Sequence, residues 1–198
     1  RLDAIRGDSA EAARLCRAVA DWGRPLLLTP RRHAEGGQRH WTEDERLTFL
    51  RACWGEVTPA AVDVEVRGDP ALVRAVRDEA PAGTRVIASY HDFHQMPAEA
   101  LLDTLAEEAV EAGADYFKVA ARAESLADTA RLACWTQTCR RIGVMSMAMG
   151  EAGVLSRVMN GAFGSAACYG HIEQATAPGQ LPVDELAALV EQLYPSDW

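Results

Sequence analysis

Lysine is nearly missing from this chain: 20 residues are Lys or Arg, and Lys118 is the only lysine among them. Excess positive charge is missing as well, since the net charge is −9 and the pI is about 5.0. A chain this acidic lacks the basic face that sequence-independent nucleic-acid binding requires, although a local arginine cluster could still bind a small anion.

Long apolar runs and paired cysteines are absent too. No run approaches the ~20 residues that cross a bilayer, and residues 1–15 contain no apolar stretch of the signal-peptide type. The five cysteines form no CxxC pair, and the histidines His40, His94 and His171 have no metal-ligand spacing. We therefore predict free thiols in a reducing, cytoplasmic compartment and no metal site.

Helical and strand patterns alternate along the whole chain. Ser9 is the expected N-cap of the first helix, and Thr42 with Glu45 has the spacing of a capping box. Helices are expected over 9–22, 41–54, 70–80, 97–114, 125–141, 151–161 and 183–194. Full strands are expected near 26–29, 62–66 (ending at Gly68), 85–89, 116–119, 144–147 and 166–169. With no repeat and no linker, residues 1–198 are predicted to form a single domain.

Strands that are apolar on both faces and alternate with helices indicate an α/β fold with a parallel sheet. The sheet is either a closed barrel or an open doubly wound sheet. No GxGxxG or GxxxxGK[ST] pattern follows the first strand, which disfavours an open nucleotide-binding sheet. Polar or otherwise unusual residues lie at the carboxyl ends of the expected strands, and in a barrel those ends meet at one mouth: Arg31, Glu65, His91, Lys118, Met147 and Met149. This pattern favours the barrel.

Lys118 and His91 are the strongest catalytic candidates. Lys118 stands between Phe117 and Val119, and a lysine desolvated by apolar neighbours can lose its proton and form an imine, which arginine cannot. The alternative is a lysine that reaches the barrel rim or pairs with a carboxylate. His91 suits general acid–base catalysis, or else it is a structural histidine with Asp92 serving only a turn.

Three further segments could contact a small anionic ligand. In TPRRHAEGG, Glu35 is a candidate to orient His91 and Arg31 a candidate oxyanion clamp, while Gly36 and Gly37 permit backbone conformations closed to other residues. Arg157 follows a strand, where a bidentate contact with a carboxylate would suit it. The proline–glycine turn QATAPGQ could fold Thr176 and Gln180 over a ligand.

Taken together, the segments resemble the type I 3-dehydroquinate dehydratases. The matching stretches run in the family's order from residue 1 nearly to the C-terminus: RLD, T-P-R-x-x-x-E-G-G, VDVEV, SYHDF, YFKVA, SMAMGEAGVLSRV, FGSAACYG and ATAPGQ. The resemblance implies a (β/α)8 TIM barrel, usually dimeric, with no cofactor or metal. It also implies a carbon–oxygen hydro-lyase of the shikimate pathway and aromatic amino acid biosynthesis, which converts 3-dehydroquinate to 3-dehydroshikimate and water.

The resemblance also implies roles for particular residues. Lys118 matches the imine-forming lysine, His91 the general acid–base, and Glu35 the carboxylate that positions that histidine. Substrate contacts are implied for Arg157 and Gln180 at the carboxylate, Arg1 and Arg31 near the ring hydroxyls, and Met147, Tyr169 and Thr176 along the pocket. Thr176 departs conservatively from the serine of the family, and Pro30 beside Arg31 removes a strand hydrogen bond.

Relative to the family, the match begins on the second barrel strand, at Arg1. The first βα unit, most of the second strand and a glutamate two positions before Arg1 have no counterpart in these 198 residues. A barrel without two strands would have unpaired edges. We therefore expect an N-terminally incomplete barrel, with either an omitted segment or completion by another chain or by dimerisation.

Two alternatives to an active dehydratase stay open. One is a catalytically silent, dehydroquinase-like domain that binds the ligand as a sensor or structural module; the absent start favours it, and the set of Lys118, His91 and Arg157 disfavours it. The other is a different Schiff-base barrel lyase acting on another keto acid, which the SYHDF and APGQ stretches disfavour.

Overall fold

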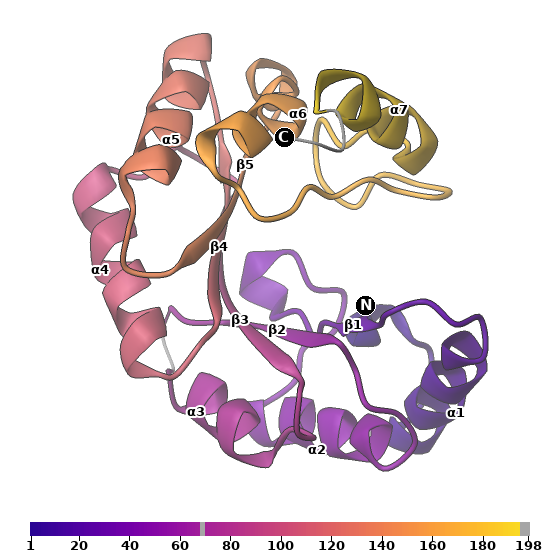
Figure 1. The fold of residues 1–198 in the computed structure, drawn as a ribbon. Coiled ribbons are helices and arrows are strands. Elements are labelled where there is room, and N and C mark those ends of the chain that lie inside the picture. The colour runs from indigo at the N-terminus through magenta and orange to yellow at the C-terminus, as the bar shows by residue number, and fades with distance from the viewer. Residues whose placement is uncertain (68–69, 195–198) are drawn as a thin grey trace. The chain divides into compact units, whose positions relative to one another are not determined.

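The structure is a computed structural model that describes residues 1–67 and 70–194, so the expected strand end at Gly68 lies outside the described residues. Its described strands follow one another in the sheet in chain order, β1-β2-β3-β4-β5. Their bounds are β1 Leu27–Leu28, β2 Ala61–Glu65, β3 Arg85–Asp92, β4 Tyr116–Arg122 and β5 Gly143–Met149. The α-helices are α1 Ser9–Ala20, α2 Glu43–Trp54, α3 Pro70–Glu79, α4 Glu99–Glu111, α5 Leu126–Thr138, α6 Ser156–Met159 and α7 Val183–Leu193 (Figure 1). Short 3-10 helices cover Leu2–Ala4, His33–Glu35, Glu151–Gly153 and Asn160–Phe163.

Two compact units make up the described chain. The first comprises residues 1–90 and 104–117, and the second comprises 91–103 and the residues from 118 onward. Along the sequence, the divisions between the units fall within strand β3, after Tyr90, and within strand β4, after Phe117.

The first unit is built on parallel strands. β1 pairs with β2 and β2 with β3, in a register that sets Val62 opposite Val86 and Val64 opposite Ala88. These four side chains are fully buried, as expected where both faces of a parallel sheet are covered. Helices α1, α2 and α3 pack successively against one another and α3 against β2 (Figure 1). The predicted α/β class with parallel strands is confirmed.

Of the two helix caps that the sequence predicted, one is confirmed and one is wrong. The capping box is present, because Thr42 accepts the Glu45 N–H and Glu45 accepts the Thr42 N–H. The prediction of Ser9 as an N-cap is wrong: Ser9 is the first helical residue, and Asp8 accepts the Glu11 N–H at 2.9 Å. Asp8 has the extended backbone that a cap requires, and its carboxylate also suits the positive end of the helix dipole.

In the second unit, the strand expected near 166–169 is wrong. Residues 165–170 form no regular element, and their pairing with β5 includes a single backbone bond from Ala166 N–H to the Val144 carbonyl at 2.8 Å. The next hydrogen bond between this segment and β5 involves a side chain: the Ser146 N–H donates to Ser165 Oγ at 3.0 Å. A hydroxyl in place of a carbonyl breaks the ladder, so FGSAACYG runs beside β5 without becoming a strand.

The helix expected over 151–161 is also divided. It consists of the 3-10 turn Glu151–Gly153, the four-residue α6 and the 3-10 turn Asn160–Phe163. Gly153 permits the first turn, since a Cβ there would lie 2.5 Å from the Ala148 carbonyl. Tight turns directly after β5 are thus what carry Arg157.

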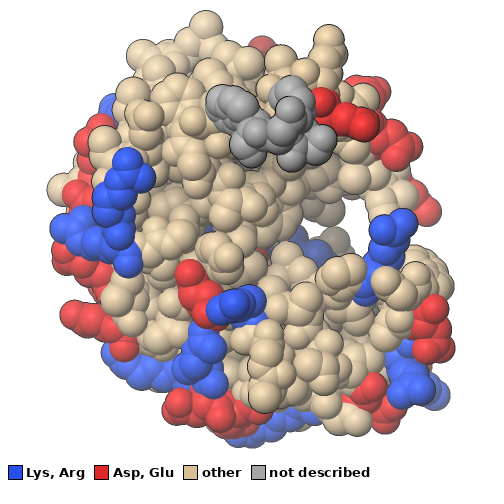
Figure 2. Space-filling view, in the orientation of Figure 1, with Lys and Arg blue, Asp and Glu red and all other residues tan. Residues whose placement is uncertain are grey.

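Basic and acidic side chains lie interspersed on the face shown in Figure 2, rather than separated by sign. Within the described ranges, no helix is long and apolar enough to cross a membrane.

Candidate active site

Lys118 is the third of the seven residues of β4 and is only 7% exposed. The sequence predicted it at the carboxyl end of its strand, and this detail is wrong, because pairing continues to Arg122 and then through Ala123 N–H to the Met149 carbonyl. The Lys118 Nζ lies 4.4 Å from the ring centroid of Tyr169, within cation–π range. The lone lysine is therefore a buried amine against an aromatic face.

Apolar side chains surround this part of the second unit. Ala120, Met147 and Met149 form a buried cluster, against which Phe93, Tyr169 and Ala177 pack. Ala120 follows Lys118 by two positions, so both side chains project from the same face of β4. The cluster thus excludes water on the side of the strand from which the amine projects.

His91 is the seventh of the eight residues of β3 and is half-buried. The adjacent Asp92 accepts backbone N–H groups of His94 and Gln95 at 2.9 and 3.1 Å. Asp92 thus takes part in the turn that follows the strand. The turn fixes the path of the backbone at the end of β3, next to His91.

Arg157 is a buried cation without a counter-ion among residues 1–67 and 70–194. It is 3% exposed, its Nη2 donates to the Pro178 carbonyl at 2.9 Å, and its buried Nε has no partner in that part of the chain. Burial lowers the pKa of its guanidinium below the ordinary value. Buried charges are normally paired, so this geometry leaves a place for an anion from outside the chain.

The preceding residue holds Arg157 in place. Ser156 Oγ accepts the Ala148 N–H at 2.7 Å and donates to the Gly153 carbonyl at 2.6 Å. One hydroxyl therefore ties the end of β5 to the turn that follows, and Arg157 is the next residue.

Thr176 and Gln180 form one turn, as the sequence predicted. Gln180 Oε1 accepts the N–H and hydroxyl of Thr176 at 2.8 and 3.0 Å, and its Nε2 donates to the Gly170 carbonyl at 2.9 Å. Gly179 has φ +75°, and a Cβ there would lie 2.8 Å from the Gly150 carbonyl oxygen. The turn and the segment after β5 are in close contact, and Pro178 bonds to Arg157 from this turn.

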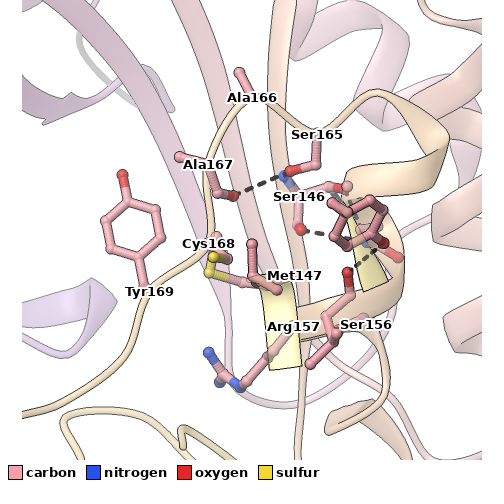
Figure 3. Close-up of a pocket in the computed structure, with 14 residues that line it drawn as sticks. Ser146, Met147, Ser156, Arg157, Ser165, Ala166, Ala167, Cys168 and Tyr169 are labelled. Atoms are coloured by element: carbon pink, nitrogen blue, oxygen red, sulfur yellow. Dashed lines mark hydrogen bonds between the residues drawn. The ribbon is translucent and has the colours of Figure 1, made fainter. Parts of the chain in front are cut away.

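Met147, Arg157 and Tyr169 line one pocket of about 310 Å³ in this unit (Figure 3). Sequence reasoning missed the polar part of its wall. Asn160 Nδ2 donates to Ser146 Oγ at 2.9 Å, while the buried Asn160 Oδ1 has no partner among the described residues. Asn160 resembles any residue that ends a short helix, so no local signal distinguishes it.

In the first unit, Arg31 is enclosed by acceptors. It is 3% exposed, and its guanidinium bonds to Glu65, to Asp63 at 2.8 Å and to Ser89 Oγ at 2.8 Å. Burial alone would lower the pKa of Arg31, but Asp63 and Glu65 outweigh it and raise that pKa. The sequence predicted Glu65 at this strand end and missed Asp63 and Ser89.

A second buried arginine, which the sequence analysis did not single out, completes this network. Arg46 of α2 is fully buried, its Nε donates to the Pro30 carbonyl at 2.8 Å, and its Nη atoms bond to Glu65 and Glu43. Glu65 therefore lies between two guanidinium groups. Arg46 looks from its sequence position like one more charged helix residue.

Arg1 contacts the loop that follows β1, and Glu35 belongs to that loop. Arg1 binds Asp3 through two bonds of 2.8 and 2.7 Å and donates to the Gly36 carbonyl at 2.9 Å. Glu35 is 8% exposed, in the 3-10 turn that Gly36 ends with φ +86°. Arg1, Arg31 and Glu35 thus all belong to the first unit, where the Gly36 carbonyl joins Arg1 to the loop that contains the other two.

Gly37 should be essential to the loop. A Cβ there would lie 2.3 Å from the Arg31 carbonyl oxygen, so Gly37→Ala must displace the backbone beside Arg31. We expect a loss of at least about 2 kcal/mol in the free energy of unfolding. Denaturant unfolding would measure this, with Gly55→Ala as the control, because a Cβ at Gly55 meets its nearest atom at 3.5 Å. Equal stability of the two variants would contradict the expectation.

Within the described ranges, no group of three or more His, Cys, Asp or Glu side chains is placed to hold a metal ion. Of the ten predicted site residues, the second unit carries seven: His91, Lys118, Met147, Arg157, Tyr169, Thr176 and Gln180. The structure brings some of these seven into contact. Lys118 lies against Tyr169, a single pocket is lined by Met147, Arg157 and Tyr169, and Thr176 bonds to Gln180.

Comparison with known proteins identifies the family. The model of the type I 3-dehydroquinase family matches residues 1–197. The 3-dehydroquinate dehydratase of Shouchella clausii is 36% identical over 194 residues, which cover 93% of this chain and 73% of that protein. The enzyme of Methanosarcina mazei is 35% identical over 201 residues, covering 98% of this chain and 83% of that one.

Solved structures of the same family also resemble this chain. 3-Dehydroquinate dehydratase from Geobacillus kaustophilus matches with a TM-score of 0.81 at 31% identity, covering 94% of this chain and 74% of that one. The type I enzyme from Clostridium difficile, crystallised with covalent modified comenic acid, matches with a TM-score of 0.86 at 26% identity, covering 96% and 77%. The predicted fold class is thus confirmed as the α/β fold of these TIM-barrel structures, and the chain belongs to the type I 3-dehydroquinase family.

Proposed function

We propose that this protein is a 3-dehydroquinate dehydratase, which eliminates water from 3-dehydroquinate to give 3-dehydroshikimate. Family membership supports the hydro-lyase activity. The observation that carries the mechanism is Lys118, the only lysine of the 198 residues, buried to 7% exposure against the ring of Tyr169.

The proposed first step is attack of the Lys118 amine on the C3 carbonyl of the substrate, with loss of water to form an imine. The imine accepts electrons, so removal of a C2 proton gives an enamine instead of an enolate. Expulsion of the C1 hydroxyl as water, and then hydrolysis of the imine, release the product. Covalent modification of a bound compound in the Clostridium difficile relative is consistent with such chemistry.

His91 is the proposed general acid–base. It would take the C2 proton, return a proton to the departing hydroxyl and assist formation and hydrolysis of the imine. Glu35 is the proposed carboxylate that orients it. His91 directly precedes the turn closed by Asp92, which supports a fixed position for the ring.

The remaining predicted residues are proposed to bind substrate. Arg157 would pair with the substrate carboxylate, which would supply the counter-ion that its buried guanidinium lacks among the described residues, and Gln180 would bind nearby. Arg1 and Arg31 are proposed near the ring hydroxyls, and Met147, Tyr169 and Thr176 along the wall.

No metal or cofactor is proposed, because the imine itself supplies the electron sink. A cytoplasmic location is proposed on the five free thiols and would be tested by cell fractionation. A homodimer is proposed on exposed apolar side chains such as Ile172 (87%) and Leu155 (54%). A particle mass near twice 21.5 kDa in light scattering would support the dimer.

Borohydride reduction tests the function and the imine together. The protein is mixed with 3-dehydroquinate, reduced, and analysed by intact mass and peptide mapping. We expect one adduct per chain on the peptide that contains Lys118, while 3-dehydroshikimate accumulates in unreduced samples. Product formation without an adduct would refute the imine, and an adduct without product would indicate the silent binding domain instead.

A further inference from the structure

Two cysteines distant in sequence meet inside the first unit. Cys16 lies on α1 and Cys53 on α2, 37 positions apart, and their sulfur atoms are 3.4 Å from each other. Cys16 is 7% exposed and Cys53 is fully buried. The other three cysteines are exposed or half-buried on or near elements of the second unit.

Buried cysteines often serve only as small apolar side chains. This pair differs in two respects. The two thiols contact each other, and the contact shifts their pKa values in opposite directions. The hydrogen bond between the two thiols lowers the pKa of Cys16 to about 7 against the opposing effect of burial, whereas the same bond and burial raise the pKa of Cys53. At neutral pH, Cys16 is therefore present in part as the thiolate, which is the nucleophilic form, beside the Cys53 thiol.

We propose that Cys16 and Cys53 form a redox-modification site, at which a hydroperoxide converts the two thiols into a reversible disulfide between α1 and α2. The sulfur atoms need to approach by roughly 1.4 Å to reach the bond length of ~2.05 Å. Because α1 and α2 pack directly on each other, the two sulfur atoms are already in contact before oxidation.

The proposed reaction has two steps. The Cys16 thiolate attacks hydrogen peroxide, so that an S–O bond forms, the O–O bond breaks and hydroxide leaves, giving the sulfenic acid. Cys53 then loses its proton and attacks the Cys16 sulfur, so that the S–S bond forms, the S–O bond breaks and the second oxygen leaves as hydroxide. The two hydroxides end as water. In sum, two thiols are oxidised by two electrons and one peroxide is reduced to two waters.

The disulfide would close a long loop that contains β1 and the segment carrying Arg31 and Glu35. Cross-links of this length restrict the unfolded chain, so the oxidised protein should unfold about 5–10 °C above the reduced one. The proposal does not depend on the catalytic function, because none of the proposed catalytic residues takes part.

The clearest test uses a triple variant, Cys134→Ser/Cys139→Ser/Cys168→Ser, which keeps only the proposed pair. All three replaced residues are exposed or half-buried, so the fold should tolerate the change. After treatment of the reduced protein with hydrogen peroxide, we expect both thiols to be lost, a Cys16–Cys53 linked peptide in the non-reducing map, the higher unfolding temperature, and reversal of all three by dithiothreitol.

Wild-type protein and Cys53→Ser serve as controls. The wild type should give the same linked peptide, and Cys53→Ser should instead accumulate a Cys16 sulfenic acid that dimedone traps. If Cys53→Ser does not fold, the triple variant decides alone. Recovery of both thiols unmodified, over-oxidation without a linked peptide, or links between chains would each overturn the proposal.

Discussion

Replacement of Lys118 with arginine is expected to reduce kcat/KM for 3-dehydroquinate at least about 10⁴-fold and to abolish the borohydride-trapped adduct. The substitution keeps the positive charge, and it makes the chain entirely lysine-free. A guanidinium keeps its proton at working pH and cannot form an imine, so the nucleophile is lost even where the cation is kept.

Two further variants separate chemistry from packing at this position. Lys118 is 7% exposed beside Tyr169, and the larger guanidinium of arginine could strain this site. Lys118→Met has a similar length and no charge, so it should retain the fold, as judged by near-UV circular dichroism and the unfolding temperature, yet lose activity to the same extent.

The double variant Lys118→Arg/Arg122→Lys is the matched control. Arg122 is the exposed last residue of the same strand, and the exchange restores one lysine to the chain. An amine on β4 outside the apolar cluster should rescue neither activity nor the adduct. Activity in Lys118→Arg within about tenfold of wild type would contradict the imine mechanism.

Replacement of Arg157 with glutamine is expected to lower kcat/KM about 10²- to 10³-fold, mainly through a higher KM. The guanidinium is 3% exposed, and its Nε has no partner among residues 1–67 and 70–194, so a substrate carboxylate would become its counter-ion. Loss of a buried charged contact weakens ground-state and transition-state binding together, which raises KM more than it reduces kcat.

Arg157→Gln should weaken catalysis without weakening the fold. Because burial lowers the pKa of Arg157, the folded protein holds this proton less tightly than the unfolded chain does. Keeping the group charged therefore costs folding free energy at every pH below that pKa, including neutral pH. Arg157→Gln should consequently unfold at the same temperature as wild type or higher, a trade of stability for binding.

Arg122→Gln provides the control for net charge, since it removes the same charge from an exposed position. It should leave KM and the unfolding temperature near the wild-type values. If Arg157→Gln unfolds well below wild type with an unchanged KM, then Arg157 is a structural residue and the proposed role in carboxylate binding is wrong.

Local patterns predicted much of the architecture, because they record properties of single elements. The strand around Lys118, the capping box of Thr42 and the turn from Thr176 to Gln180 are all encoded within a few adjacent residues. The order of motifs then pointed to the family. Lys118 itself was conspicuous because every other residue in the combined count of lysine and arginine is an arginine.

Other predictions failed where the outcome depended on a neighbouring segment. Residues 166–169 have the composition of a strand, but Ser165 Oγ takes the N–H that a ladder carbonyl would accept. Lys118 was expected at a strand end, but pairing along β4 continues for four more residues. Whether a segment pairs as a strand depends on the segment beside it in the fold, and neither the periodicity nor the propensity of its own residues contains that information.

The alternating order of strands and helices, the family and the identity of the amine proposed to react all follow from the order of residues alone. The folded chain is needed to show which distant side chains meet: Arg31 with Asp63, Arg46 with Glu65, and Cys16 with Cys53. The fold likewise shows that Arg157 is buried without a counter-ion among the described residues. The reason is physical, since burial and charge pairing arise from contacts between residues far apart in the chain, and these contacts form only when the elements pack.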